Sequence, residues 1–164
     1  MTSFDNRFME LLKYVDEATY IKDMKLIFEI ISESPAPASA THHNCFEYGN
    51  IDHTLNVMEA IVKYQLYPCG KRAKMLRLAL LHDWGKVNAY DFTSDGIEKI
   101  LSYDDILETF YSIGKFGLEL DEEEKNAIAF HHGGWTRHSN ANRMNSLAVY
   151  LHCADLIASQ VIER

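Results

Sequence analysis

One apolar segment near the middle of the chain does most to limit the folds available to it. Residues Leu76 to Leu81 are apolar except for Arg77, so the surrounding segment, about Lys71 to Trp84, predicts a helix that is hydrophobic nearly all round. Such a helix has no face suited to water, and we expect it to be the buried central helix of the fold. Gly85 is expected to close it.

Apolar residues recur at helical spacing on both sides of this segment, and one short stretch favours a hairpin instead. Apolar runs flank Ser94-Asp95-Gly96, which predicts a single small β-hairpin near residues 90–101. Pro35 and Pro37 are expected to stop the second helix and to hold an extended loop up to Gly49. The predicted class is therefore all-α, with about seven helices. The helices are expected around Phe8–Val15 and Met24–Ile31, divided near Asp16 to Ala18, and at about Ile51–Gln65, Lys71–Trp84, Asp104–Phe116, Asp121–His132 and Asn145–Glu163.

Length, charge and cysteine content limit the class of protein. The 164 residues fit one domain with a real core, and the formal charge of -8 disfavours long nucleic acid as a partner. Three cysteines without CxxC spacing favour reduced thiols over a disulfide framework or a zinc ribbon. The first ten residues have no apolar core of a signal peptide, and no apolar run reaches the ~20 residues needed to span a bilayer. We expect a cytoplasmic protein with no membrane association.

Residue types that bind metals occur where core-facing groups are expected on several predicted helices. His82-Asp83 ends the apolar central helix, and His53 lies on the helix before it. His131-His132 ends the sixth helix, and Asp155 lies on the apolar stripe of the last. A buried carboxylate or imidazole is costly without a partner, and helical bundles build metal sites from side chains on facing helices. An isolated His-Asp pair would instead favour a helix cap.

This ordered set resembles the HD-domain superfamily of metal-dependent phosphohydrolases. The resemblance rests on His53, His82-Asp83 with Gly85-Lys86, His131-His132 and Asp155, and it covers about residues 42–158. It implies a single HD domain over residues 1–164, with N-terminal helices in residues 1–40 and the metal-site core in residues 41–164. The stretch His42 to Gly49 is also similar to the subset that includes bacterial HD-type 3′–5′ exoribonucleases. Those enzymes carry a further nucleic-acid-binding domain, for which this chain has no room.

The resemblance implies particular roles for these residues. His53, His82, Asp83 and Asp155 would ligate one divalent ion, while Asp83 would bridge to a second ion held by His131, with His132 as a further candidate ligand. Lys86 would face the phosphate, so Asp83 and Lys86 are the expected catalytic residues. A mixed shell of imidazole and carboxylate suits Mn, Fe, Co, Ni or Zn, with Mg as an option at a second site. One or two ions would activate water for attack at phosphorus.

Other polar residues are candidates for contacts with the substrate. His42 and His43 lie in the loop that leads into the His53 helix, and Arg137 and Arg143 lie in a basic run after the His131 helix. For the arginines, a solvated loop is an equal alternative. His131 could be no more than a helix cap, and His152 could be an ordinary core histidine with its hydrogen bonds satisfied.

The function expected is metal-dependent hydrolysis of a phosphoester or phosphoanhydride bond in a nucleotide or nucleotide-like substrate. One alternative is a 3′–5′ nuclease or phosphodiesterase acting on short single-stranded oligonucleotides or cyclic dinucleotides. Another is a non-catalytic, nucleotide-binding regulator, although the intact His53, His82, Asp83, Lys86 and Asp155 argue against it. The expected partner is a small phosphorylated molecule, and the chain could also form a homo-oligomer.

Overall fold

A computed structural model of the chain describes residues 2–94, 96–100, 103–135 and 143–163. Within these residues it contains seven α-helices and one two-stranded antiparallel sheet, as the periodicity predicts. Across the described ranges, no helix combines the length and the hydropathy of a bilayer span. The elements are α1 (Ser3–Leu12), α2 (Ala18–Glu33), α3 (Gly49–Tyr64), α4 (Arg72–Leu81), η1 (Trp84–Asn88), β1 (Tyr90–Thr93), β2 (Gly96–Lys99), α5 (Asp105–Lys115), α6 (Glu122–Phe130), η2 (Gly133–Trp135), α7 (Ser146–Ile157) and η4 (Ala158–Ile162).

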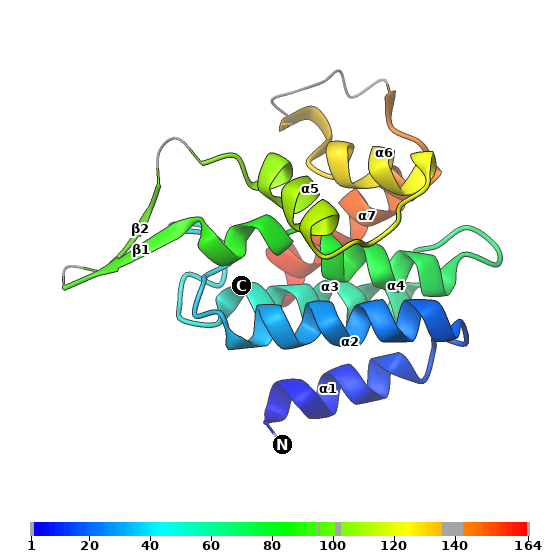
Figure 1. Cartoon of the computed structure of the whole chain (residues 1–164), viewed down its shortest axis with the longest axis horizontal. Coiled ribbons are helices and arrows are strands. Elements are labelled where there is room, and N and C mark those ends of the chain that lie inside the picture. The colour runs from blue at the N-terminus through cyan, green and yellow to red at the C-terminus, as the bar shows by residue number, and fades with distance from the viewer. Residues whose placement is uncertain (1, 95, 101–102, 136–142, 164) are drawn as a thin grey trace.

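Helix α4 is the buried centre that its composition predicts. Every residue from Met75 to Leu81 is buried. Figure 1 shows α3 and α4 between α1 and α2 on one side and α5, α6 and α7 on the other. Because α4 has protein on all sides, the groups at its C-terminal end lie inside the molecule, and the helices on both sides can reach them.

The end of α4 differs from the prediction. The α-helix ends at Leu81 with His82 as its C-cap, and Trp84 begins the short 3-10 helix η1. Gly85 therefore does not close α4. It lies inside η1, where a Cβ atom would be 2.0 Å from the backbone oxygen of Asp105. Glycine allows the start of α5 to pack directly on η1, and this packing holds the chain just after His82 and Asp83.

The hairpin and the proline loop also follow the sequence. Strand β1 pairs with β2 from Tyr90 opposite Lys99 to Thr93 opposite Gly96, and Asp95 of the predicted turn lies outside the described residues. The loop of residues 34–48 folds onto the start of α3: Tyr48 N donates to Pro35 O at 3.0 Å, and Asn50 N donates to Ala36 O at 2.9 Å. This loop brings His43 toward α3.

Candidate metal centre

Four helices deliver the predicted ligands to one place. His53 lies in the first half of α3, His82 caps α4 and is followed by Asp83, His131 caps α6, and Asp155 lies on α7. His53, His82, Asp83 and His131 are all buried. Residues spread over a hundred positions of sequence therefore meet inside the protein.

The Asp83 carboxylate lies at the centre of the cluster. Its Oδ2 is 3.2 Å from His82 Nε2 and 3.8 Å from His53 Nε2, and its Oδ1 is 3.7 Å from His131 Nε2. Asp155 approaches from α7, with its Oδ1 3.1 Å from His53 Nε2. The ε nitrogens of three imidazoles thus converge on carboxylate oxygens.

The other ring nitrogen of each of these histidines is already engaged. His82 Nδ1 lies 2.6 Å from Ala79 O, and His131 Nδ1 lies 2.7 Å from Ile128 O. His53 Nδ1 lies 2.9 Å from a carboxylate oxygen of Glu163. Carbonyl and carboxylate oxygens only accept hydrogen bonds, so Nδ1 carries the proton in each ring and donates it. In a neutral ring this leaves the lone pair on Nε2, which is the arrangement of a metal ligand.

The converging atoms lack hydrogen-bond partners of their own. Within the described residues, His53 Nε2, His82 Nε2, His131 Nε2 and Asp83 Oδ1 are buried and have no hydrogen bond of acceptable geometry. Orphaned polar atoms in a protein interior are costly, and a bound cation would satisfy all four. The residues present therefore fit a divalent metal ion.

The predicted ligand atoms form two overlapping groups, and a third group of possible ligands, His43, His53 and Glu163, shares His53 with the first. Those of His53, His82 and Asp83 lie within 4.8 Å of one another, and so do those of Asp83, His131 and His132. The rings of His131 and His132 are 3.9 Å apart, so these adjacent histidines point to the same region. Asp83 belongs to both groups, so the geometry can accommodate one ion or two ions that share this carboxylate.

The cluster shifts the pKa values of its ionisable groups away from their usual range. Burial alone would raise the pKa of Asp83, but Lys86 and His82 hold that pKa well below its usual range. Burial would likewise raise the pKa of Asp155, but His53 lowers it. For His53, burial is outweighed by Asp155 and Glu163, which raise its pKa to about 10. In the metal-free protein, a proton on His53 therefore supplies part of the positive charge that a metal ion would bring.

His132 and Lys86 complete the electrostatics. Burial and the neighbouring His131 lower the pKa of His132 to about 3, which keeps this ring neutral and able to donate a lone pair. Lys86 is buried, and its Nζ lies 2.6 Å from Asp83 Oδ2. Asp83 raises the pKa of Lys86 against the opposing effect of burial, so the ammonium stays charged. The predicted phosphate-facing lysine is thus held at the edge of the cluster by its central carboxylate.

The remaining predicted residues are placed differently from one another. The His43 ring is 4.9 Å from that of His53, and its side chain is 17% exposed. His42 is exposed and lies near Thr41, with Thr41 Oγ1 3.3 Å from its Nδ1. Arg143 is exposed, and among the described residues its side chain has no ion pair with the cluster. Arg137 lies outside the described residues. Substrate contacts by these four residues stay predictions.

His152 takes the role of a histidine with a satisfied hydrogen bond. Its Nδ1 lies 2.7 Å from His131 O, so it donates to the backbone of a predicted ligand. Gly133 has a φ of +58°, and a Cβ there would lie 2.8 Å from His152 Nε2. A glycine at this position therefore lets the chain turn after His132 and leaves room for the His152 ring.

The sequence did not reveal Glu163 as part of the site. Its side chain is only 1% exposed, and it contacts His53 and Asn56. The last helical turn, η4, is a π-helix, which changes the direction in which the following residues point. Nothing in the apolar periodicity signals such a turn. In the sequence, Glu163 reads as an ordinary charged residue at a helix end.

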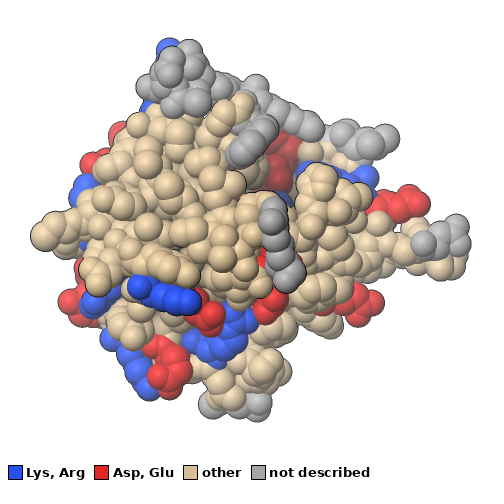
Figure 2. Space-filling model, turned by 180° about the vertical axis from the view of Figure 1, so that it is seen from behind, with Lys and Arg blue, Asp and Glu red and all other residues tan. Residues whose placement is uncertain are grey.

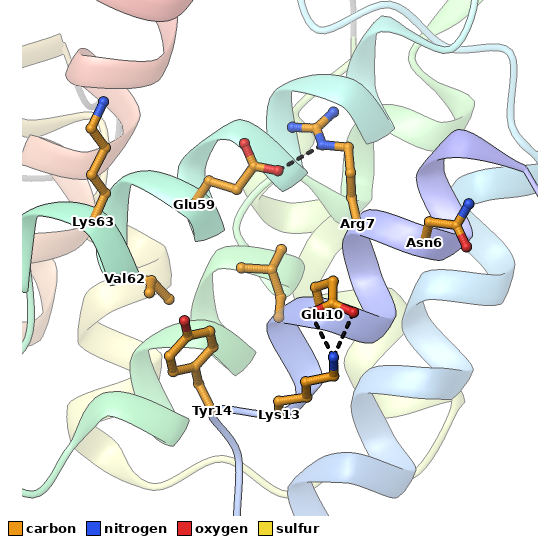
Figure 3. A pocket seen from close by; sticks show the side chains of 9 residues that line it. Asn6, Arg7, Glu10, Lys13, Tyr14, Glu59, Val62 and Lys63 are labelled. Carbon is orange, nitrogen blue, oxygen red and sulfur yellow. Dashed lines mark hydrogen bonds and ion pairs between the residues drawn. The ribbon is translucent and has the colours of Figure 1, made fainter.

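A surface pocket elsewhere does not have the features of a catalytic site. It lies between α1 and α3 and has a volume of about 710 Å³ (Figure 3). Four of its charged groups form ion pairs, since Arg7 Nε is 2.7 Å from Glu59 Oε1 and Lys13 pairs with Glu10. The histidine and aspartate cluster is therefore the stronger candidate.

Comparison with known proteins gives one match. The family model described as HD domain matches residues 50–159, which include His53, His82, Asp83, His131, His132 and Asp155. No curated protein and no solved structure matches the chain.

Proposed function

The chain belongs to the HD-domain family, whose members are generally metal-dependent hydrolases, and we propose that it hydrolyses a phosphoester or phosphoanhydride bond in a nucleotide-like molecule. One observation carries the proposal. Three buried imidazole Nε2 atoms and one buried carboxylate oxygen converge without hydrogen-bond partners among the described residues. A cluster of this kind is poorly suited to a purely structural role and well suited to holding cations.

We assign the ligands from two of the groups above, together with Asp155, whose Oδ1 lies 3.1 Å from His53 Nε2. His53, His82, Asp83 and Asp155 would hold one divalent ion, and Asp83, His131 and His132 would hold a second. Imidazole and carboxylate together suit Mn, Fe, Co, Ni or Zn better than Mg alone, although Mg could occupy the second position. When bound, the metal would supply an activated water and stabilise negative charge on the phosphoryl group.

The protein's own residues would do the rest. Asp83 would join the two ligand groups, because its Oδ1 and Oδ2 face different histidines. Lys86 would contribute a fixed positive charge beside the phosphoryl oxygens, since Asp83 holds its ammonium at the edge of the cluster. His132, which is neutral, would be free to bind as a ligand.

A small substrate agrees best with the charge distribution. The chain carries a formal charge of -8. On the face drawn in Figure 2, the basic and acidic side chains of the described residues are interspersed and form no continuous basic surface. Long nucleic acids are bound through many phosphate contacts with Lys and Arg. A nucleoside mono- or triphosphate, a dinucleoside polyphosphate or a cyclic dinucleotide places fewer phosphates in the site.

A panel of nucleotides tests the proposal. We expect Mn²⁺-loaded protein to release a phosphorylated or dephosphorylated product from at least one nucleotide, identified by mass, and the His82→Ala variant to release none. Hydrolysis of short single strands, with binding that weakens steeply as salt rises, would instead favour a 3′–5′ nuclease. A protein that takes up no Mn²⁺, Fe²⁺, Co²⁺ or Zn²⁺ would refute the proposal.

The number of ions is tested by His131→Ala. If two ions act, this variant should keep about one metal per chain and lose most turnover, because the second ion goes with His131. If one ion acts, it should keep its metal and lose only the ~10²–10⁴-fold that a general acid or base contributes. Wild-type turnover and metal content in His131→Ala would show that His131 only caps α6.

A further inference from the structure

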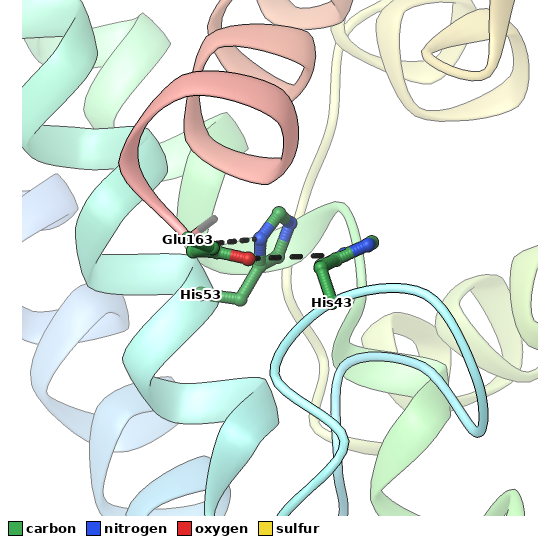
Figure 4. Close-up of side chains that lie close together, drawn as sticks. All are labelled: His43, His53 and Glu163. Atoms are coloured by element: carbon green, nitrogen blue, oxygen red, sulfur yellow. Dashed lines mark hydrogen bonds and ion pairs between the residues drawn. The ribbon is translucent and has the colours of Figure 1, made fainter.

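A carboxylate outside the proposed ligand set lies behind His53. Figure 4 shows Glu163 and His53 facing each other, with His43 close by on its loop. Glu163 Oε1 is 2.9 Å from His53 Nδ1 and 2.9 Å from Asn56 Nδ2. One buried oxygen thus accepts from a residue proposed to bind metal and from an amide one helical turn further along α3.

Asn56 is itself held from α1. Arg7 Nη2 donates to Asn56 Oδ1 at 2.6 Å, so the amide nitrogen of Asn56 must be the atom that faces Glu163. Arg7 is fixed in turn by Asp52 and Glu59, at 2.7 Å from each. A continuous chain of hydrogen bonds therefore runs from α1 through Asn56 and Glu163 to His53.

The second oxygen of Glu163 faces the proline-containing loop. Glu163 Oε2 and His43 Nε2 are 4.0 Å apart, and both are buried without a hydrogen-bond partner among the described residues. A small movement of the loop would bring them into hydrogen-bonding distance. Glu163 is thus placed to hold His53 with one oxygen and to receive His43 with the other.

We propose that Glu163 is a positioning residue, which fixes the tautomer and ring orientation of His53 so that Nε2 faces the metal. The proposal rests on the metal site assigned above. A carboxylate that accepts from the far nitrogen of a metal-binding imidazole makes the near nitrogen a better ligand. Loss of such a partner typically weakens metal binding by ~10–100-fold. Asn56 would assist by holding the carboxylate in place.

Calorimetric titration of metal-free protein with Zn²⁺ tests the proposal without relying on turnover. Glu163→Ala should bind the metal ~10–100-fold more weakly, as expected for a lost outer partner. Glu163→Gln should fall between Glu163→Ala and wild type, because the amide oxygen can still accept from Nδ1–H. Glu124→Gln is the matched control: it neutralises another buried carboxylate, which accepts from Arg77 Nη1 at 2.8 Å rather than from His53 or Asn56, and it should bind Zn²⁺ like wild type.

A second test is ¹⁵N NMR of the histidine rings in Zn²⁺-loaded protein, which reports the tautomer of His53. Wild type should show His53 with a proton on Nδ1 and the metal on Nε2, whereas Glu163→Ala should show a loosened or mixed tautomer. A merely structural Glu163 would lower the melting temperature and leave this signature unchanged. Glu163→Gln keeps the test valid if Glu163→Ala fails to fold.

Three outcomes would overturn the inference. Wild-type Zn²⁺ affinity in both Glu163 variants would show that His53 needs no such partner. An unchanged His53 tautomer in both would show the same. If the Glu163 variants lost a whole equivalent of Zn²⁺ instead of binding it more weakly, Glu163 would itself be a metal ligand together with His43. His53→Ala separates this inference from the proposed function, because full Zn²⁺ binding by that variant would refute the metal site itself.

Discussion

Two regions of the protein bury charged side chains, and they balance those charges in different ways. Arg77, on apolar α4, donates to Glu124 Oε1 at 2.8 Å, to Asp23 Oδ2 at 2.7 Å and to the backbone oxygen of Glu119 at 2.9 Å. This group, which we call the Arg77 cluster, pairs its charges within itself. In the metal-ligand cluster around Asp83, by contrast, three imidazole Nε2 atoms lack hydrogen-bond partners among the described residues.

The difference separates a structural from a functional use of buried charge. Burial of a charged group is common to both regions, so burial alone marks neither as a site. The Arg77 cluster links α2, α4 and α6 and leaves only Arg77 Nε unsatisfied among its described side chains. The ligand cluster leaves His82 Nε2, His131 Nε2 and Asp83 Oδ1 buried and unsatisfied among the described residues. Such atoms are stabilised only when a further positive group joins them.

The largest expected effect comes from removing one proposed ligand from the ligand cluster. His82→Ala removes one of the unsatisfied Nε2 atoms, and we expect it to abolish tight metal binding and to lower turnover by more than about 10⁴-fold. The reason is that a bound metal can lower the pKa of its water molecule to about 7, and this activation is lost with the metal. Elemental analysis and turnover on the best nucleotide measure both effects. Retention of metal and activity would remove His82 from the ligand set.

The next effect breaks the Arg77 cluster and should act on stability alone. Arg77→Met keeps the apolar packing of α4 but leaves Asp23 and Glu124 without their cation. Removal of one partner of a buried ion pair costs about 3–5 kcal/mol of unfolding free energy. Urea denaturation measures this loss, and Zn²⁺ titration of the folded variant should give wild-type affinity. A large loss of affinity would mean that the two regions are coupled.

The two clusters should also differ in how they affect the pH dependence of metal binding. In the metal-free protein the pKa of His53 is raised from 6.5 to about 10, so its contribution to stability is complete below pH 6.5 and is lost as pH rises through about 10. A metal ion at Nε2 must displace this proton. The apparent Zn²⁺ affinity should therefore rise by about tenfold per pH unit between about pH 6 and about pH 8.

Calorimetry in buffers of different ionisation enthalpy can count the protons released in the same experiment. Arg77→Met should show the same slope with pH as wild type, because its cluster gives up no proton to the metal. An affinity that stays flat over this range would show that the proton on His53 is not displaced, and His53 would leave the ligand set.

The sequence allowed the helices to be predicted because each has an apolar stripe at helical spacing. The predicted helix over about Lys71–Trp84 was nevertheless too long, since α4 ends at Leu81. Periodicity locates a helix better than it locates its end, and here the end depends on α5 packing against Gly85. That contact joins residues twenty positions apart and is not visible in a local pattern.

The candidate site was also only partly predictable. The convergence of His53, His82 and Asp83 followed from finding ligand-type residues on apolar helices, where an unpartnered charge is costly. Glu163 could not be found in this way, because it reaches His53 only through the π-helical turn after α7. Whether His132 joins His131 at the site was an even choice from the sequence; α6 ends at Phe130, and the ligand atoms of Asp83, His131 and His132 lie within 4.8 Å of one another.

The smallest expected effects concern two adjacent histidines beside the ligand cluster, His42 and His43. His43 is half-buried with its Nε2 4.0 Å from Glu163 Oε2, while His42 is exposed. We expect His43→Ala to weaken Zn²⁺ binding by less than about tenfold, because its ring lies beside that of His53 and faces Glu163 but is not one of the assigned ligands. His42→Ala should leave Zn²⁺ affinity unchanged within error. Titration of both variants, with KM measured on the best nucleotide, separates metal positioning from substrate contact. A higher KM with unchanged Zn²⁺ affinity in His42→Ala would place the substrate against this loop. The functional region would then extend beyond the buried cluster to exposed residues that gain partners only when the substrate binds.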